Sequence, residues 1–245
     1  AGFFEQADKC FSRALELTRA APNPLSRLLV DKLESKSFDH PILKELKSVA
    51  VENTEFEETV KEGNRAFNSG DFERAMECFS EATARKPSYA DLHCKLGLAL
   101  LELGRDEEAV ASLDRSLAQN ASYVDALYCL GVTCYRLKDY AASRTHLEKA
   151  VSLRPEYADI HCQLGVVLLA LGEYDKAKKE FEQAVEISDS YAKAHYMLGI
   201  ALHALGDNEA ANAELKQSLA INPDMFPAEL CSGVASLGSS NWAGA

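Results

Sequence analysis

The sequence lacks the features that several protein classes require. Its 26 Lys and Arg residues are outnumbered by 38 Asp and Glu residues, which gives a formal net charge of −12. This balance argues against a nucleic-acid partner, because phosphates are bound by clustered Lys and Arg. No apolar run approaches the roughly 20 residues that span a membrane, and no basic segment followed by an apolar one opens the chain. We therefore expect no membrane insertion, and a partner of basic or neutral chemistry.

The seven cysteines include no Cys-x-x-Cys pair. His93-Cys94 and His161-Cys162 look like ligand doublets, but adjacent residues of a helix point in different directions and the two doublets are far apart in the sequence. We therefore predict no metal and no cofactor. Free cysteines that serve as small buried apolar residues fit the cytoplasm or another reducing compartment.

Catalytic patterns are also missing. No nucleophile, base and orienting group can be assembled from the spacing, and no glycine-rich phosphate-binding loop follows a strand pattern. The acidic run Asp106, Glu107 and Glu108 is expected at a helix start, where negative charge is favourable. The sequence thus predicts that the chain is not an enzyme.

Glycine is scarce but regularly placed. Ten of the 13 glycines recur with one fixed period, the spacing from Gly63 to Gly97, and fall into two phases. The first phase holds Gly63, Gly97, Gly131, Gly165, Gly199 and Gly233, and the second holds Gly70, Gly104, Gly172 and Gly206. A unit of this size cannot bury its apolar face alone. The period therefore predicts a solenoid in which neighbouring units complete a common core.

Each repeat reads as two helices around a tight turn. Leu96, Leu100 and Leu103 have helical spacing, and Leu113 resumes it after a break at Gly104. The segments LGLALLELGRDEEAVASLDRSL and LGVVLLALGEYDKAKKEFEQAV resemble the tetratricopeptide repeat. The resemblance implies an all-α fold, a right-handed superhelical solenoid of antiparallel helix pairs, in which the first helix of each pair lines a concave groove.

Other residue types also recur at the same position of successive repeats, and each such set is called a column here; these columns define where each repeat begins and ends. Bulky apolar residues recur at Phe79, Leu113, Leu147, Phe181 and Leu215, and small residues recur at Ala82, Ser116, Ala150, Ala184 and Ser218. We expect the bulky column to fill the core and the small one to mark close helix contacts. These columns define five tandem repeats over 56–225, with frames 56–89, 90–123, 124–157, 158–191 and 192–225.

The flanks read as incomplete repeats. Residues 1–21 resemble the second helix of a truncated repeat, and 226–245 the C-terminal helix of a partial repeat with a frayed tail. Residues 22–55 have the length of one repeat and are interpreted as a degenerate one, with short helices near 25–34 and 41–51. A linker is the alternative, supported by Pro22, Pro24 and Pro41. Both ends suggest a piece of a longer array.

The resemblance also implies which positions line the groove, namely the second, fifth, ninth, twelfth and thirteenth of each repeat. Helical geometry groups these offsets on one face. The residues predicted to bind a partner are Asn64, Asn68, Asp91, Cys94, Leu98, Leu101, Asp125, Tyr128, Val132, Tyr135, Arg136, Asp159, Cys162, Val166, Leu169, Lys193, Tyr196, Ile200 and His203. The floor is apolar and aromatic, which favours an interaction surface. The alternative is that neighbouring repeats cover some of these residues.

One edge of the predicted groove is acidic. Glu57, Asp91, Asp125 and Asp159 occupy the same position in four successive repeats. A ladder of like charges should attract Lys or Arg on a ligand. Helix capping is the other explanation, because Asp near a helix start satisfies free N–H groups.

A second resemblance concerns VKEGNRAFNSGDFERAMECFSEAT, which is similar to the first repeat of chaperone adaptors that hold an acidic C-terminal tail. Asn64 matches the asparagine of their carboxylate clamp, but the clamp lysine falls on Val60. The second-repeat asparagine falls on Lys95, and the third-repeat lysine and arginine fall on Asp125 and Cys129. Because Asp125 would repel a carboxylate, we predict that the chain is not a carboxylate-clamp adaptor.

These patterns favour a protein–protein interaction scaffold or adaptor. Its groove would take a peptide or helix that carries apolar and basic residues. A structural self-assembly unit is the alternative, a homo-oligomer formed through the groove or the N-terminal region. A third interpretation is the repeat arm of a larger enzyme such as a glycosyltransferase.

Overall fold

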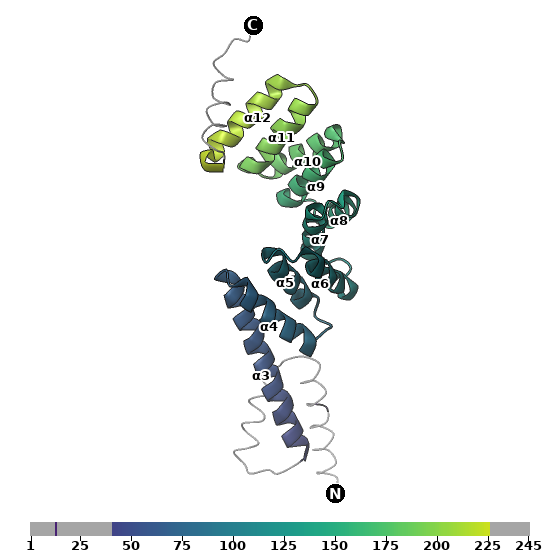
Figure 1. The fold of residues 1–245 in the computed structure, drawn as a ribbon, viewed down its shortest axis with the longest axis vertical. Helices are drawn as coiled ribbons and strands as arrows, with labels where there is room; N and C mark the ends of the chain where they lie inside the picture. Colours follow the sequence, from purple (N-terminus) through teal and green to yellow (C-terminus); the bar gives the residue numbers. More distant parts are fainter. Residues whose placement is uncertain (1–12, 14–40, 226–245) are drawn as a thin grey trace, which may run out of the picture. The chain divides into compact units, whose positions relative to one another are not determined.

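The computed structural model describes Arg13 and residues 41–225. The expectations for the rest of 1–40 and for 226–245 lie outside the described residues. The described part is all-α, as predicted, with ten α-helices, a short 3-10 helix and no strand (Figure 1). The helices are α3 (Pro41–Asn68), α4 (Phe72–Arg85), α5 (Ala90–Glu102), α6 (Asp106–Gln119), α7 (Val124–Arg136), α8 (Tyr140–Leu153), α9 (Ala158–Ala170), α10 (Tyr174–Ile187), α11 (Ala192–Ala204) and α12 (Asn208–Ile221), followed by η1 (Pro223–Met225).

The chain divides into two compact units, with the boundary in the sequence between Pro87 and Ser88. Of the first unit, the structure describes α3 and α4, which pack as an antiparallel pair. The Phe79 ring is buried, and a Cβ atom added at Gly63 would lie 2.9 Å from it. The bulky column therefore fills the space that the glycine column leaves open.

The start of the first repeat differs from the expectation. The sequence predicts one helix near 41–51 and a new one from Phe56, whereas α3 is a single helix of 28 residues, Pro41–Asn68. The intervening residues Val51 to Glu55 contain neither Gly nor Pro, so nothing in the sequence ends the helix there. Glu57 consequently lies inside a helix and caps none.

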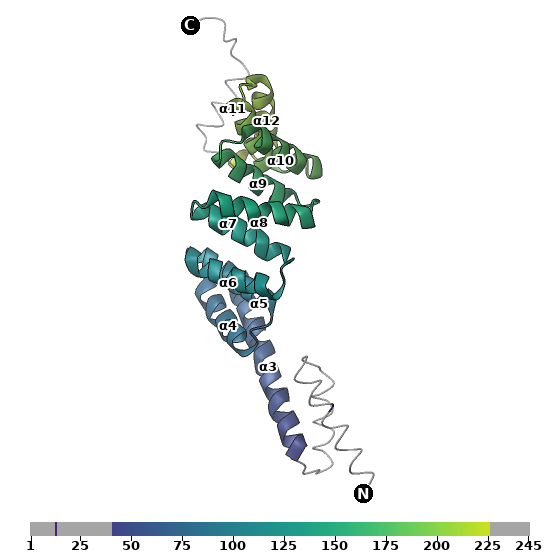
Figure 2. The same ribbon diagram turned by 90° about the vertical axis from the view of Figure 1, so that its right-hand side faces the viewer.

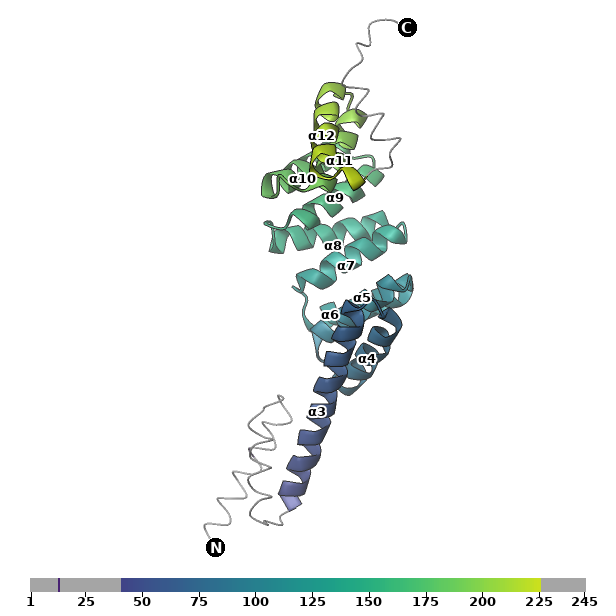
Figure 3. The same ribbon diagram turned by 90° about the vertical axis from the view of Figure 1, so that its left-hand side faces the viewer.

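The second unit contains the four helix pairs from α5 to α12, which follow one another in chain order (Figures 2 and 3). Leu113, Leu147 and Phe181 of the bulky column are fully buried. Ser116 Oγ donates to the Ala90 carbonyl oxygen at 2.8 Å, and Ser218 Oγ donates to that of Ala192 at 2.7 Å. Serine in the small column thus fastens the second helix to the start of the first without leaving its hydroxyl unpaired.

The turn inside each pair repeats one hydrogen-bond pattern. After α5, the Gly104 N–H donates to the Leu101 carbonyl at 3.0 Å and the Arg105 N–H to the Leu100 carbonyl at 2.9 Å. This is a Schellman motif, which needs a left-handed residue at its turn, and Gly104 has φ 72°. In the third repeat Lys138 takes this position with φ 64°. The second glycine column is therefore a column of helix ends.

First and second helices form separate layers in the second unit. Each first helix packs against its own second helix, and α7, α9 and α11 also pack against the second helix of the preceding pair, which is α6, α8 and α10 respectively. Successive first helices also touch: α5 with α7, α7 with α9 and α9 with α11. The first helices thus form one continuous inner layer. Their side chains that do not face the second helices lie on the predicted groove face.

Candidate protein-binding face of the first helices

An apolar column runs along the first helices of the second unit. Its members recur with the period of the repeat, at the ninth position of each frame: Leu98 on α5, Val132 on α7, Val166 on α9 and Ile200 on α11. The first three are half-buried, whereas Ile200 is 37% exposed. No polar side chain takes this position in the four repeats, so these helices carry an apolar strip that is accessible along its length.

Aromatic side chains flank the strip. Tyr128, Tyr135 and Tyr196 are half-buried, and Tyr135 contacts Tyr140 with ring centroids 5.5 Å apart. Tyr128, Tyr135 and Leu169 pack with part of their surface against the core and leave the rest accessible. Burial raises the pKa of the Tyr128 hydroxyl to about 12, so it stays a neutral donor at physiological pH.

Three of the predicted groove residues are buried instead. Cys94, Leu101 and Cys162 pack between neighbouring repeats, so their side chains are not offered to a ligand in this structure. Cys94 lies within hydrogen-bonding reach of Cys129 on α7, and this contact together with burial raises the pKa of the Cys94 thiol strongly. All cysteines in the described part of the chain are free and buried, in keeping with their expected role as small apolar residues.

The acidic column makes contacts between repeats. Asp91 Oδ1 accepts a hydrogen bond from the Tyr123 hydroxyl at 3.1 Å, and Asp91 Oδ2 lies 3.0 Å from Lys95 Nζ. Burial and the nearby Asp159 carboxylate raise the pKa of the Tyr191 hydroxyl, which belongs to the loop before the next first helix. The N-cap residues of these helices are tyrosines, Tyr123 before α7 and others at the same position. Asp91 and Asp159 therefore link repeats rather than serving as N-caps.

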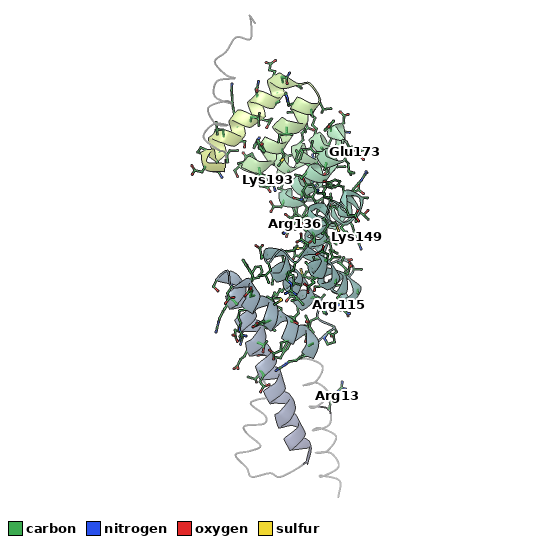
Figure 4. All side chains as sticks on the ribbon, in the orientation of Figure 1. Arg13, Arg115, Arg136, Lys149, Glu173 and Lys193 are labelled. Carbon is green, nitrogen blue, oxygen red and sulfur yellow. The ribbon has the colours of Figure 1, made fainter. Side chains whose placement is uncertain are left out.

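The other charged positions differ in availability. Arg136 Nε lies 3.1 Å from Asp106 Oδ2, and Arg136 Nη1 donates to the Leu101 carbonyl at 3.3 Å, so this guanidinium joins α7 to the pair before it. Lys193 is exposed and takes the ladder position on α11, where it ends the run of acids (Figure 4). His203 is exposed, with Nδ1 2.7 Å from Asn208 Oδ1. Asn64 and Asn68 lie on α3, in the first unit.

The structure shows the surroundings of three residues that occupy positions of the carboxylate clamp. Lys95, where a clamp asparagine would lie, is paired with Asp91, and Cys129 is buried. Asp125 is exposed at the start of α7. These surroundings offer a carboxylate ligand little positive charge.

Sequence reasoning missed the partners of two residue types. Tyrosines recur at Tyr89, Tyr123, Tyr157 and Tyr191, and each closes a frame whose second position is an acidic ladder residue. Histidines of the first helices pair with carboxylates of the second helices, His161 with Glu180 at 2.7 Å and His195 with Glu214 at 2.6 Å. The tyrosines and histidines recur at fixed positions of the repeat, but only the packing of the helices shows which side chains they meet.

Two kinds of site are not found in the described part of the chain. Residues 41–225 contain no group of three metal-ligating side chains, and none of their helices is long and apolar enough to cross a membrane.

Family models described as tetratricopeptide repeat match residues 60–123, 123–190 and 156–224. The chain belongs to the tetratricopeptide repeat family. A comparison with curated proteins gives no match. Among solved structures, a crystal structure of MamA protein aligns with a TM-score of 0.62 and 24% identity, over 69% of this chain and 92% of that one. MamA 41-end from Desulfovibrio magneticus RS-1 aligns with a TM-score of 0.64 and 20% identity, over 70% and 97%.

A third similar structure is YrrB, described as a TPR protein with an unusual peptide-binding site. It aligns with a TM-score of 0.60 and 22% identity, over 73% of this chain and 90% of that chain. At these identities the neighbours show a common fold and nothing about a shared ligand.

Proposed function

We propose that this tetratricopeptide repeat protein is an interaction scaffold whose first-helix face binds a peptide or helix carrying apolar and basic residues. The observation that carries the proposal is the uninterrupted column Leu98, Val132, Val166 and Ile200, partly exposed on four successive first helices. Val166 packs with part of its surface against the core, but every member of the strip keeps part of its surface accessible. Apolar surface that stays exposed on several neighbouring helices is typical of interaction sites.

The charge around the strip favours a basic ligand. Asp91, Asp125 and Asp159 are exposed along one side, and the whole chain has a formal net charge of −12. Complementary charge raises association rates and selects partners more than it adds affinity. We therefore expect apolar anchors to supply most of the binding free energy and basic residues to supply selectivity. An acidic C-terminal tail is not the ligand that this face favours.

The proposal is tested with a displayed peptide library and one matched pair of variants. Selected peptides should be enriched in apolar and basic residues. Ile200 on α11 and Ile187 on α10 are the same residue type with similar exposure, 37% and 40%, on different helices of neighbouring pairs. Ile200→Asp should weaken a selected peptide about tenfold or more, because a charge replaces an apolar contact, whereas Ile187→Asp should leave the affinity within about twofold.

Two other outcomes would contradict the proposed ligand or the proposed binding face. Enrichment of acidic C-terminal peptides would restore the carboxylate-clamp interpretation. Equal losses for the two isoleucine variants would show that binding does not use the first-helix face.

A further inference from the structure

A cavity lies between two successive inter-repeat loops of the second unit, the one that joins α6 to α7 and the one that joins α8 to α9. Its volume is about 390 Å³, within the range of roughly 300–1,000 Å³ that is typical of small-ligand pockets. Tyr123 and Asp125 line it from the first loop and the start of α7, and Arg154 and Tyr157 line it from the second. The cavity therefore combines two aromatic rings with one acidic and one basic side chain.

Asp125 differs from its counterparts in the neighbouring repeats. In the repeat before, the Tyr123 hydroxyl donates to Asp91 at 3.1 Å. In the repeat after, burial and the nearby Asp159 carboxylate raise the pKa of the Tyr191 hydroxyl. The tyrosine that would serve Asp125 by the same rule is Tyr157, which is 47% exposed. No hydrogen bond or ion pair within residues 41–225 engages the Asp125 carboxylate. Among these three repeats of the described chain, Asp91 accepts a tyrosine hydrogen bond, Asp159 interacts with the nearby Tyr191 hydroxyl, and Asp125 has no such partner.

Arg154 and the Tyr123 hydroxyl, which also line the cavity, already have partners. The Arg154 guanidinium lies 5.7 Å from the centroid of the Tyr157 ring, and its Nη1 is 3.4 Å from Glu156 Oε1. Arg154 and Glu156 offset each other, so Asp125 leaves the neighbourhood with one uncompensated negative charge. The Tyr123 hydroxyl is committed to Asp91, which leaves its ring as an apolar wall.

We propose that this cavity binds an arginine side chain of the partner peptide. The guanidinium donates to the Asp125 carboxylate, in the place that the Tyr123 hydroxyl takes beside Asp91 in the preceding repeat. A guanidinium suits the site because it forms two parallel hydrogen bonds with a carboxylate and stacks on aromatic rings such as that of Tyr123. The inference rests on the proposed function, since the rest of the peptide lies along the first-helix face, and it gives that face one position of defined selectivity.

An anion is the competing occupant. Arg154 and the N-terminal amides of α7 would attract one. The Asp125 carboxylate in the same cavity opposes it, and the Arg154 charge is already offset by Glu156. The structure therefore favours the cation, and the anion is an outcome that the experiment separates.

The test uses the full chain and small probes followed by NMR of the backbone amides. N-acetyl-arginine methylamide should give saturable shifts at Tyr123, Asp125 and Tyr157, while the neutral isostere N-acetyl-citrulline methylamide should bind at least about tenfold more weakly. Asp125→Asn should weaken the arginine probe by a similar factor. Asp159→Asn is the matched control, because it removes the same charge from the next repeat at a residue that does not line the cavity, and it should change the affinity by less than about twofold.

Two results would overturn the proposal. Saturable binding of inorganic phosphate at these amides, with no preference for the arginine probe, would make the cavity an anion site. Absence of saturable shifts with either probe would show that the cavity has no arginine subsite. Both results leave the first-helix face untouched, since its own test is the isoleucine pair and the peptide library.

Discussion

His161 and Glu180 form a partly buried pair whose geometry favours a proton on both ring nitrogens. Nδ1 of His161 lies 2.7 Å from Oε2 of Glu180, and Nε2 lies 2.9 Å from the Pro155 carbonyl oxygen. A carbonyl oxygen and an ionised carboxylate both accept, so both ring nitrogens donate only in the imidazolium form. The hydrogen bond to Glu180 accordingly raises the pKa of His161 above its usual value, although burial opposes it.

Stability should therefore fall as the pH rises through the raised pKa of His161. The folded state binds this proton more tightly than the unfolded chain, so the stabilisation is complete below the ordinary histidine pKa of about 6.5 and is lost above the folded value. Urea unfolding between about pH 5.5 and pH 9 measures this. Glu180→Gln should lower the free energy of unfolding by about 1–3 kcal/mol at the acidic end and flatten the pH dependence. A variant that keeps the full dependence would assign it to another group.

Gly131 and Leu147 should behave as one packing unit. A Cβ atom added at Gly131 would lie 2.5 Å from Cγ of Leu147, a fully buried side chain that has no room to yield. Gly131→Ala and, more severely, Gly131→Leu should lower the free energy of unfolding, by about 1–3 kcal/mol for overpacking. Leu147→Ala should cost about 2–5 kcal/mol through its cavity. In a double-mutant cycle, the variant with both Gly131→Ala and Leu147→Ala should lose less unfolding free energy than the sum of the losses of the two single variants. Strict additivity would show that the two side chains do not share this space.

The helix pairs could be predicted because every repeat places a glycine on its first helix where a bulky side chain of its second helix needs room. A glycine on the first helix and a bulky residue at a fixed distance along the chain, such as Gly131 and Leu147, can only be neighbours if the two helices cross closely. Because the sequence is periodic, the same contact recurs in each repeat. The recurring residues therefore predict both the helix pairs and their order along the chain.

The accessibility of individual groove positions could not be predicted in the same way. Cys94 and Tyr128 occupy the same position of successive repeats, yet the first is buried and the second is half-exposed, because burial depends on how closely the neighbouring repeat approaches. Tyr123 and Tyr157 also share a column, but only Tyr123 of these two donates to an aspartate. The extent of α3 was missed because a repeat frame marks where helices recur, not where one continues.

The acidic column as a whole should also act on a ligand through long-range attraction. Changing Asp91, Asp125 and Asp159 together to Asn should leave unfolding cooperative, since all three are exposed and an amide oxygen can still accept the hydrogen bond from Tyr123. Binding of a hexa-arginine peptide should weaken several-fold at low ionic strength, and its dependence on salt should become shallower. Fluorescence anisotropy at several salt concentrations measures both.

The matched control for the acidic column removes the same charge from another layer. It replaces Glu107, Asp114 and Glu148 of the second helices with the corresponding amides. Equal effects of the two triple variants would show that net charge, rather than the column, attracts the peptide.

Lys138 marks a turn where the chain forgoes a stabilising glycine. Its φ of 64° is the left-handed conformation that Gly104 and Gly172 adopt at the same position of neighbouring repeats. A residue with a side chain pays about 1–2 kcal/mol to adopt this conformation, whereas glycine adopts it without strain. Part of that gain is lost, because glycine also makes the unfolded chain more flexible and so stabilises the unfolded state. Lys138→Gly should therefore raise the free energy of unfolding by about 0.5–1 kcal/mol, with a higher Tm in thermal unfolding.

The reverse exchange, Gly172→Lys, should lower the free energy of unfolding by a similar amount. Both substitutions place nothing within the core, because a Cβ at Gly172 meets no atom within 4 Å and Lys138 is exposed. Opposite signs of the two shifts would thus report backbone conformation alone. A loss of stability in both variants would mean that the Lys138 side chain contributes a contact that outweighs its strain.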